Sequence, residues 1–269
     1  MPDLEKICAR LTEALGGDAV VECHETLAST QTRAREIARQ RGTLTRGVVV
    51  AGEQTEGRGR LKRRWESPVG SGIYFSVFFR PSLPPSETHL VNLAAALAVE
   101  EAARALLGAD LTLKWPNDLL ISRFENGGKT EAKVCGILSE SAFQGASLAY
   151  CVTGIGLNLY EPRECAAARG WLCGEGREID EADLLARIVS DFFGRVDAME
   201  RGGSAGVLET YRGKCASVGR TVTVETGGEK LSGICSGIGG EGELILDTPE
   251  GERRFHAADV THAHLSEWT

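Results

Sequence analysis

The pattern of apolar and polar positions predicts a chain in which helices and strands are interleaved as far as about residue 214. The clearest helix lies in residues 89–108, which are rich in alanine and end at a glycine. Further helices are predicted in residues 1–17, 30–40, 181–200 and 204–213. Strands are predicted where aliphatic and aromatic residues cluster between turns, in residues 19–25, 46–54, 72–81, 111–115, 118–122, 133–141 and 147–159. This part of the chain therefore predicts a mixed sheet with helices packed on it.

The pattern changes from about residue 215, where short strand-like segments alternate with glycine-rich turns. Such spacing predicts a small β-barrel or meander of about 50 residues. The predicted fold class is α+β, with one domain in residues 1–214 and a small β domain in residues 215–269.

Composition and charge restrict the class of protein. Hydrophobic residues make up 42% and charged residues 25% of the chain, as in ordinary globular proteins. No apolar run approaches the ~18 residues of a membrane helix. A formal net charge of -8 argues against general nucleic-acid binding. The eight cysteines form no CxxC pair and no zinc-site spacing. These features predict a cytoplasmic protein without a membrane partner.

One segment has the opposite charge. Residues 57–72 read GRGRLKRRWESPVGSG, and five of the first nine side chains are cationic. Gly57 and Gly59 allow the backbone to approach a ligand closely, and arginines bind carboxylate or phosphate oxygens through two donors. The segment predicts a mobile loop that becomes ordered when a polyanion neutralises it. Taken alone, such a segment is more often a solvated basic loop or a weak nucleic-acid patch, so its neighbours in the sequence must decide between the interpretations.

Three other segments carry polar side chains that suit either a structural role or a ligand. Ser29 or Thr30 could cap the following helix, or face a small polar ligand. Asn117 and Asp118 could be turn residues, or could bind a nucleotide and a magnesium ion. Lys133 enters an apolar strand and could extend to solvent, or could stabilise developing negative charge.

Together and in this order, these segments resemble biotin protein ligases, which attach biotin to a lysine of a carboxylase carrier domain. The matching stretches are AST (28–30), GRGR…RRWESP (57–68), KWPND (114–118), KVCGILSE (133–140) and GIGLNL (154–159). The resemblance implies a catalytic domain related to class II aminoacyl-tRNA synthetases and an SH3-like C-terminal domain. It also implies biotin and ATP as substrates, with Mg²⁺, and a reaction through biotinyl-5′-AMP.

The resemblance implies roles for individual residues. The catalytic positions are Lys133 and Arg58, with Lys133 contacting the biotin carboxylate and the α-phosphate. The biotin-binding positions are Ser29, Thr30, Gln31, Gln54, Arg58, Gly59, Arg60, Lys133 and Gly136. The ATP-binding positions are Arg60, Arg63, Trp65, Asn117, Asn158 and Trp171. Asp118 is expected to help hold Mg²⁺.

The implied partner is a biotin carboxyl carrier domain, and the chain could be a monomer or a homodimer. Some family members carry an N-terminal winged-helix domain, but only about twenty residues precede the first predicted strand. This predicts a monofunctional ligase that does not bind DNA. A lipoate or octanoate ligase of the same fold is the alternative, although it would have a different glycine-rich signature near the ligand.

Two features depart from the family pattern. Family loops often have a glycine where Lys62 stands, after Leu61, so this loop is expected to be stiffer and more cationic. Residues 122–132 form a longer polar connection, in which we expect a mobile hairpin tip.

Overall fold

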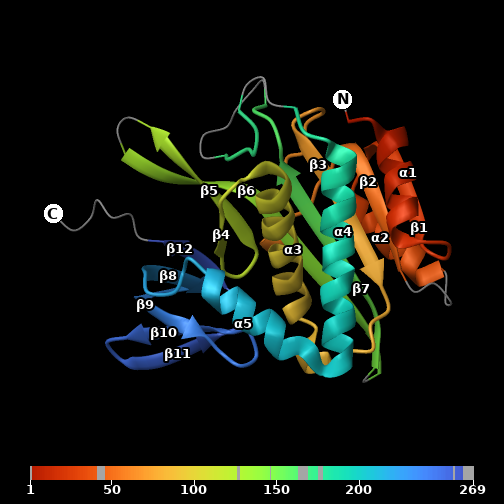
Figure 1. The fold of residues 1–269 in the computed structure, drawn as a ribbon. Helices are drawn as coiled ribbons and strands as arrows, with labels where there is room; N and C mark the ends of the chain where they lie inside the picture. The colour runs from red at the N-terminus through yellow and green to blue at the C-terminus, as the bar shows by residue number, and fades with distance from the viewer. Residues whose placement is uncertain are drawn as a thin grey trace.

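The computed structural model describes residues 2–40, 46–125, 128–145, 147–162, 169–174, 178–256 and 258–262. Within these ranges the chain forms a seven-stranded sheet flanked by helices and a five-stranded C-terminal sheet (Figure 1). The helices are α1 (Leu4–Leu15), α2 (Thr30–Gln40), α3 (Leu90–Leu107), α4 (Glu181–Ala198) and α5 (Ser204–Lys214). The strands of the large sheet are β1 (Val20–Leu27), β2 (Arg46–Gln54), β3 (Gly72–Phe79), β4 (Leu111–Lys114), β5 (Asp118–Glu125), β6 (Gly128–Gln144) and β7 (Ser147–Asn158). The predicted α+β fold class is confirmed.

The large sheet has the strand order β1-β2-β3-β7-β6-β5-β4. β1 and β2 pair in parallel, with α2 between them in sequence, because a parallel pair needs a crossover connection. The other neighbouring strands pair antiparallel. The predicted polar connection at residues 122–132 is instead mostly strand, since β5 and β6 continue pairing up to Glu125 and Gly128. Inter-strand backbone hydrogen bonds do not depend on side-chain polarity. The expected mobile tip, residues 126–127, lies outside the described residues.

Helices cover the two faces of the large sheet unequally. α1, α3 and α4 contribute to the main core, where Phe79 of β3 packs edge-to-face on Phe192 and Phe193 of α4, with centroids 5.5 and 5.9 Å apart. On the other face, a smaller cluster joins Ala34 and Ile37 of α2 to the sheet. This arrangement leaves the strands beyond the N-terminus of α2 available for a ligand.

The C-terminal sheet contains β8 (Thr221–Thr226), β9 (Glu229–Ile238), β10 (Leu244–Thr248), β11 (Gly251–Phe255) and β12 (Asp259–His262), in the order β11-β10-β9-β8-β12. It contacts the first domain at several points. Trp115, which is 2% exposed, donates from Nε1 to the carbonyl oxygen of Gly242 at 2.9 Å. Arg220 forms a two-point ion pair with Glu131 of β6 at 2.8 and 2.9 Å. The small domain is therefore attached directly beside the Trp115–Asp118 turn.

A histidine at this contact predicts a pH dependence of stability. Burial lowers the pKa of His89, and the nearby His256 ring, 6.4 Å away between centroids, lowers it further, while Glu241, Glu243 and Glu87 act in the opposite direction. Because the folded pKa is below the usual value of about 6.5, the unfolded chain binds a proton that the folded chain does not. The free energy of unfolding should therefore fall as pH decreases from about 7 to about 5. We expect a smaller fall in His89→Gln, measured by urea denaturation at both pH values. An equal fall in both proteins would contradict this assignment.

Candidate functional site

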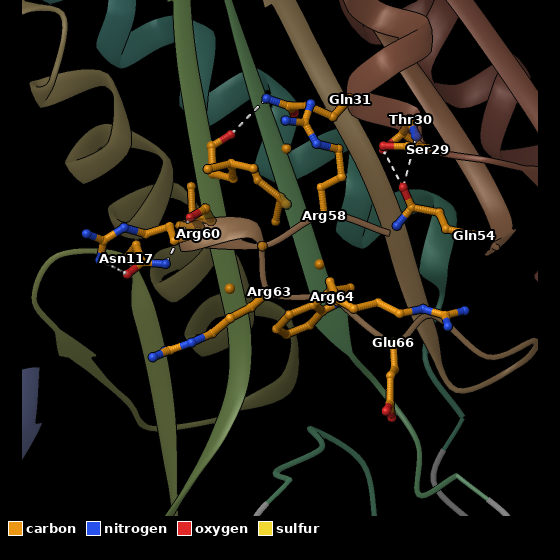
Figure 2. Close-up of a pocket in the computed structure, with 18 of the residues that line it drawn as sticks. Ser29, Thr30, Gln31, Gln54, Arg58, Arg60, Arg63, Arg64, Glu66 and Asn117 are labelled. Carbon is orange, nitrogen blue, oxygen red and sulfur yellow. Dashed lines mark hydrogen bonds between the residues drawn. The ribbon is translucent and has the colours of Figure 1, made fainter. Parts of the chain in front are cut away.

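A cavity of about 290 Å³ opens where the N-terminus of α2, the basic loop and strands β6 and β7 meet (Figure 2). Every site residue selected from the sequence lines it, except Trp171. The segments that supply them are separated by up to about half of the chain, and the sheet brings them together. Figure 2 shows Ser29, Thr30 and Gln54 on one side of the cavity, with Arg60 and Asn117 on the opposite side.

The cavity is strongly cationic although the whole chain is acidic. Its lining includes six basic side chains and two acidic ones. The basic side chains are Arg58, Arg60, Arg63, Arg64, Lys133 and Arg169, and the acidic ones are Glu66 and Asp118. Such a concentration of like charge attracts anions and is stabilised when one binds. The site is therefore suited to a ligand with phosphate or carboxylate groups.

The N-terminus of helix α2 is capped by a side chain from strand β2. Gln54 accepts from the backbone N–H of Thr30 at 2.9 Å and from its hydroxyl at 3.1 Å, and donates to Ser67 Oγ at 2.9 Å. The Ser29 hydroxyl is buried and has no hydrogen-bond partner among the described residues. The prediction of a Ser29 or Thr30 side-chain cap is therefore replaced by a cap from Gln54. Ser29 Oγ is left as an unused donor and acceptor in the cavity wall.

The basic loop is a small hairpin-like structure in this state. Gly59 N–H donates to Arg63 O at 2.8 Å, and Trp65 N–H donates to Gly57 O at 2.9 Å. A Cβ on Gly57 would lie 2.3 Å from Trp65 O, so only glycine fits there. Arg60 extends from the loop to Asn117 Oδ1 at 3.0 Å and to the carbonyl oxygen of Ala258 at 3.1 Å. The loop thus contacts both the KWPND turn and the C-terminal domain.

Lys62, which stands where the family often has a glycine, and the preceding Leu61 both adopt a glycine-like backbone. Leu61 and Lys62 have φ values of 52° and 61°, in the left-handed region that side chains disfavour. This explains physically why a glycine suits the position of Lys62. The expected stiffness and mobility of the loop stay predictions.

Trp65 forms one wall of the cavity against two glycines. Cβ atoms on Gly136 and Gly156 would lie 2.7 and 2.3 Å from atoms of the Trp65 ring, so β6 and β7 accommodate the ring only because both residues lack side chains. Trp65 Nε1 is buried without a hydrogen-bond partner in the described part of the chain. Lys133 Nζ lies 5.2 Å from the ring centroid, within range of a cation–π interaction.

Lys133 and Asp118 face each other inside the cavity. Lys133 Nζ lies 2.6 Å from Asp118 Oδ1, and the two side chains form an ion pair. The side chains are 36% and 19% exposed, so the pair is only partly screened by solvent. Lys133 therefore points into the cavity, which agrees with the functional interpretation of its position and excludes simple extension to bulk solvent.

Two asparagines have partners that hold their amides in place. Asn117 Nδ2 donates to Ile137 O and Asn158 Nδ2 donates to Gly170 O, each at 3.1 Å. Trp171, next in sequence to Gly170, is not in the cavity wall, because its ring lies under the Arg123 guanidinium, 3.3 Å from the ring centroid. Its expected contact with adenine stays a prediction.

Several lining residues were not selected from the sequence. They are Arg64, Glu66, Phe75, Ser76, Ile137, Leu138, Gly154, Ile155, Gly156 and Arg169. Ser76 had a usable signal, as the one serine in a strand of aliphatic and aromatic residues. Arg169 had none, since its place beside Lys133 comes from a bridge between distant segments. Cys135 neighbours the site, but complete burial raises the pKa of its thiol, which argues against a nucleophilic role.

Two other kinds of feature, a metal site made of protein side chains alone and a membrane-spanning helix, are not found in the described ranges. These residues form no group of three or more His, Cys, Asp or Glu side chains that could hold a metal ion by themselves. Within the same ranges, no helix is both long and apolar enough to span a membrane.

The fold is α+β, and its cationic cavity, lined by a glycine-rich arginine loop, is of the class that suits a small ligand together with a polyanion. The chain belongs to the biotin/lipoate A/B protein ligase family, whose sequence model matches residues 24–158. The biotin protein ligase C-terminal domain matches residues 218–262.

Individual relatives agree with this assignment. The chain is 32% identical over 260 residues to the bifunctional ligase/repressor BirA of Bacillus subtilis, covering 93% of this chain and 75% of that protein. It is 32% identical over 221 residues to biotin–[acetyl-CoA-carboxylase] ligase of Paracoccus denitrificans, covering 79% and 88%. A solved structure of biotin protein ligase from Aquifex aeolicus, in complex with biotin and ATP, superposes with a TM-score of 0.71 at 25% identity. That alignment covers 91% of this chain and 98% of the other.

Proposed function

We propose that this chain is an ATP-dependent ligase that activates biotin as biotinyl-5′-AMP and transfers it to a lysine of a biotin carboxyl carrier domain. The observation that supports this function most directly is the cationic cavity in which Lys133 and the loop arginines surround space for a carboxylate and a polyphosphate. Two anions that must react repel each other in water, and fixed positive charge offsets that repulsion. The carrier partner follows from the names of relatives such as the Paracoccus denitrificans enzyme.

The first step joins biotin to AMP. A carboxylate oxygen of biotin attacks the α-phosphorus of ATP, the bond to the bridging oxygen breaks, and pyrophosphate leaves. Lys133 would contact the reacting carboxylate and the α-phosphate, with Arg58 beside them. Ser29, Thr30, Gln31, Gln54, Gly59 and Gly136 would form the biotin pocket, and Arg60, Arg63, Trp65, Asn117, Asn158 and Trp171 the ATP pocket.

The second step transfers the acyl group. The uncharged ε-amine of the carrier lysine attacks the carbonyl carbon of the mixed anhydride, AMP leaves with the bonding electrons, and the nitrogen releases one proton to form the amide. The basic loop, closed over the adenylate, would limit hydrolysis by water. The prediction that the chain does not bind DNA stays a prediction, as does its state as monomer or homodimer.

Asp118 suits the magnesium ion that accompanies ATP. Mg²⁺ in such sites is commonly held by one or two carboxylates together with phosphate oxygens and water. Asp118 lines the cavity with a carboxylate, so it would serve as a protein ligand once the ion replaces the contact between Asp118 Oδ1 and Lys133 Nζ at 2.6 Å. The ion would neutralise phosphate charge when bound.

We also propose a division into a catalytic domain, residues 1–214, and a C-terminal domain, residues 215–269.

Pyrophosphate exchange into ATP tests this function. We expect exchange that depends on biotin and is absent with lipoate or with neither acid. Exchange with lipoate alone would move the chain to the lipoate branch of the same family, and no exchange with either acid would contradict adenylation altogether. With biotin present, a purified carrier domain should then acquire one biotin per acceptor lysine, detected by mass spectrometry.

A further inference from the structure

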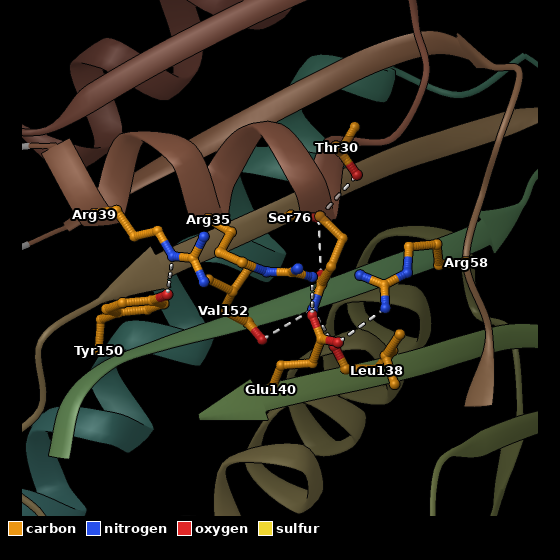
Figure 3. A network of polar contacts seen from close by, with 10 residues as sticks. Thr30, Arg35, Arg39, Arg58, Ser76, Leu138, Glu140, Tyr150 and Val152 are labelled. Carbon is orange, nitrogen blue, oxygen red and sulfur yellow. Dashed lines mark hydrogen bonds and ion pairs between the residues drawn. The ribbon is translucent and has the colours of Figure 1, made fainter. Parts of the chain in front are cut away.

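Glu140 of β6 does not line the cavity, but its carboxylate contacts two side chains that do, those of Arg58 and Gln31. Its carboxylate lies between side chains from α2 and from the basic loop (Figure 3). Oε1 is 3.2 Å from Arg58 Nη2, and Oε2 is 2.6 Å from Arg35 Nη2 and 3.1 Å from Gln31 Nε2. Glu140 ends the KVCGILSE stretch, and nothing in the reaction described above uses it.

These contacts fix the direction of the Gln31 amide. Gln31 Nε2 also lies within hydrogen-bond distance of the carbonyl oxygens of Leu138, at 3.2 Å, and Val152, at 3.3 Å, while Oε1 accepts from Ser76 Oγ at 3.3 Å. A Cβ on Gly154 would lie 2.5 Å from Gln31 Oε1, so the amide also fits closely against β7. Gln31 is 3% exposed, and it has little freedom to adopt another rotamer.

The charges of the group leave Arg58 available to an anion. One carboxylate shared by the guanidinium groups of Arg35 and Arg58 leaves one positive charge uncompensated. Arg35 makes the shorter contact with Glu140, and Arg58 is the member that lines the cavity. The uncompensated charge is therefore located where an anionic ligand would arrive.

We propose that Glu140 is a positioning residue for biotin activation, which holds the Arg58 guanidinium and the Gln31 amide in their binding positions before the ligand arrives. The proposal rests on the proposed function. Pre-ordering these two side chains lowers the entropy lost when the ligand binds, because a long arginine side chain on a glycine-flanked loop would otherwise sample many rotamers. The same contact anchors the start of the basic loop to the central sheet.

The test is Glu140→Gln, which keeps the shape of the side chain and removes its charge. We expect the KM for biotin in pyrophosphate exchange to rise about ten-fold, with a smaller change in kcat, since charged hydrogen bonds to Arg58 are weakened. Combining Glu140→Gln with Arg58→Met should raise KM by less than the product of the two single effects, because Glu140 acts partly through Arg58 and partly through Gln31. Fully additive effects in this cycle would overturn the proposal.

Glu22→Gln is the matched control. Glu22 also pairs with an arginine of α2, Arg33, at 2.8 and 2.9 Å, and it does not line the cavity. We expect normal kinetics in this control. Glu140→Asp, which retains the charge on a shorter side chain, is the second variant if Glu140→Gln folds poorly, and its KM should also rise.

The outcomes separate this inference from the proposed function. If wild-type protein shows no biotin-dependent exchange, the proposed function fails whatever the variants do. If wild-type protein is active and Glu140→Gln behaves like Glu22→Gln, only the positioning role is overturned. A lower KM in Glu140→Gln would also overturn it, because Glu140 would then compete with the ligand for Arg58.

Discussion

Replacing Lys133 by alanine should reduce biotin adenylation by about 10²-fold or more, mainly through kcat. Lys133 Nζ lies inside the cavity, 2.6 Å from Asp118 Oδ1, and its charge is held where the carboxylate and the α-phosphate would meet. A charge fixed there stabilises the transition state without reorganising at the moment of reaction. The measurement is the rate of biotin-dependent pyrophosphate exchange at saturating biotin and ATP.

A lysine elsewhere in the chain provides the control for this experiment. Lys230 lies in the C-terminal sheet, is 68% exposed and pairs with Glu225 at 3.5 Å. Because exposed ion pairs contribute little, Lys230→Ala should leave both stability and exchange nearly unchanged. Near-normal adenylation by Lys133→Ala, in a protein that unfolds at the wild-type temperature, would rule out the proposed role of Lys133.

Gly156→Ala should reduce the affinity for ATP by about ten-fold or more, because a misplaced side chain in a ligand site is costly even when displaced only slightly. The added Cβ would lie 2.3 Å from Trp65 Nε1, closer than any real contact, so the Trp65 ring must move. Trp65 forms the wall between β7 and the basic loop, and we place it in the ATP pocket. The dissociation constant for ATP, measured by calorimetry, reports the change directly.

A second glycine substitution separates this local effect from general destabilisation. A Cβ on Gly194 of α4 would meet no atom within 4 Å, so Gly194→Ala should be tolerated and could raise stability through better helix propensity. Combining Gly156→Ala with Trp65→Ala should remove the steric part of the defect. If Gly156→Ala binds ATP as wild type does, the Trp65 ring is not held in a functional position.

The pH dependence assigned to His89 concerns a different part of the molecule. His89 lies where the start of α3 meets the C-terminal part of the chain. Arg60 links the basic loop to the same part of the chain through the carbonyl oxygen of Ala258. His89 and Arg60 therefore both contact the C-terminal part of the chain, at His256 and Ala258 respectively.

The sequence by itself indicated most of the local elements and most of the residues predicted for the site that line the cavity. Apolar spacing located most helices and strands to within a few residues, because periodicity follows directly from which face of an element is buried. It missed the extension of β5 and β6 through residues 122–125 and 128–132, where the strand residues are mostly polar. The glycines and arginines of residues 57–64 were compatible with an anion-binding loop, and only their order with the neighbouring motifs favoured that interpretation over a solvated basic loop. Lys133 was recognisable as a charged residue in an apolar strand.

Only the tertiary structure decided which side chains contact one another. The cap of α2 comes from Gln54, 24 positions from Thr30, and Glu140 contacts Arg58 across 82 positions. Trp171 lies under Arg123 rather than in the cavity wall, and Gly156 is required by the ring of Trp65. These pairings depend on strand order and register, which bring distant segments together, and local sequence patterns carry no information on partners at that separation.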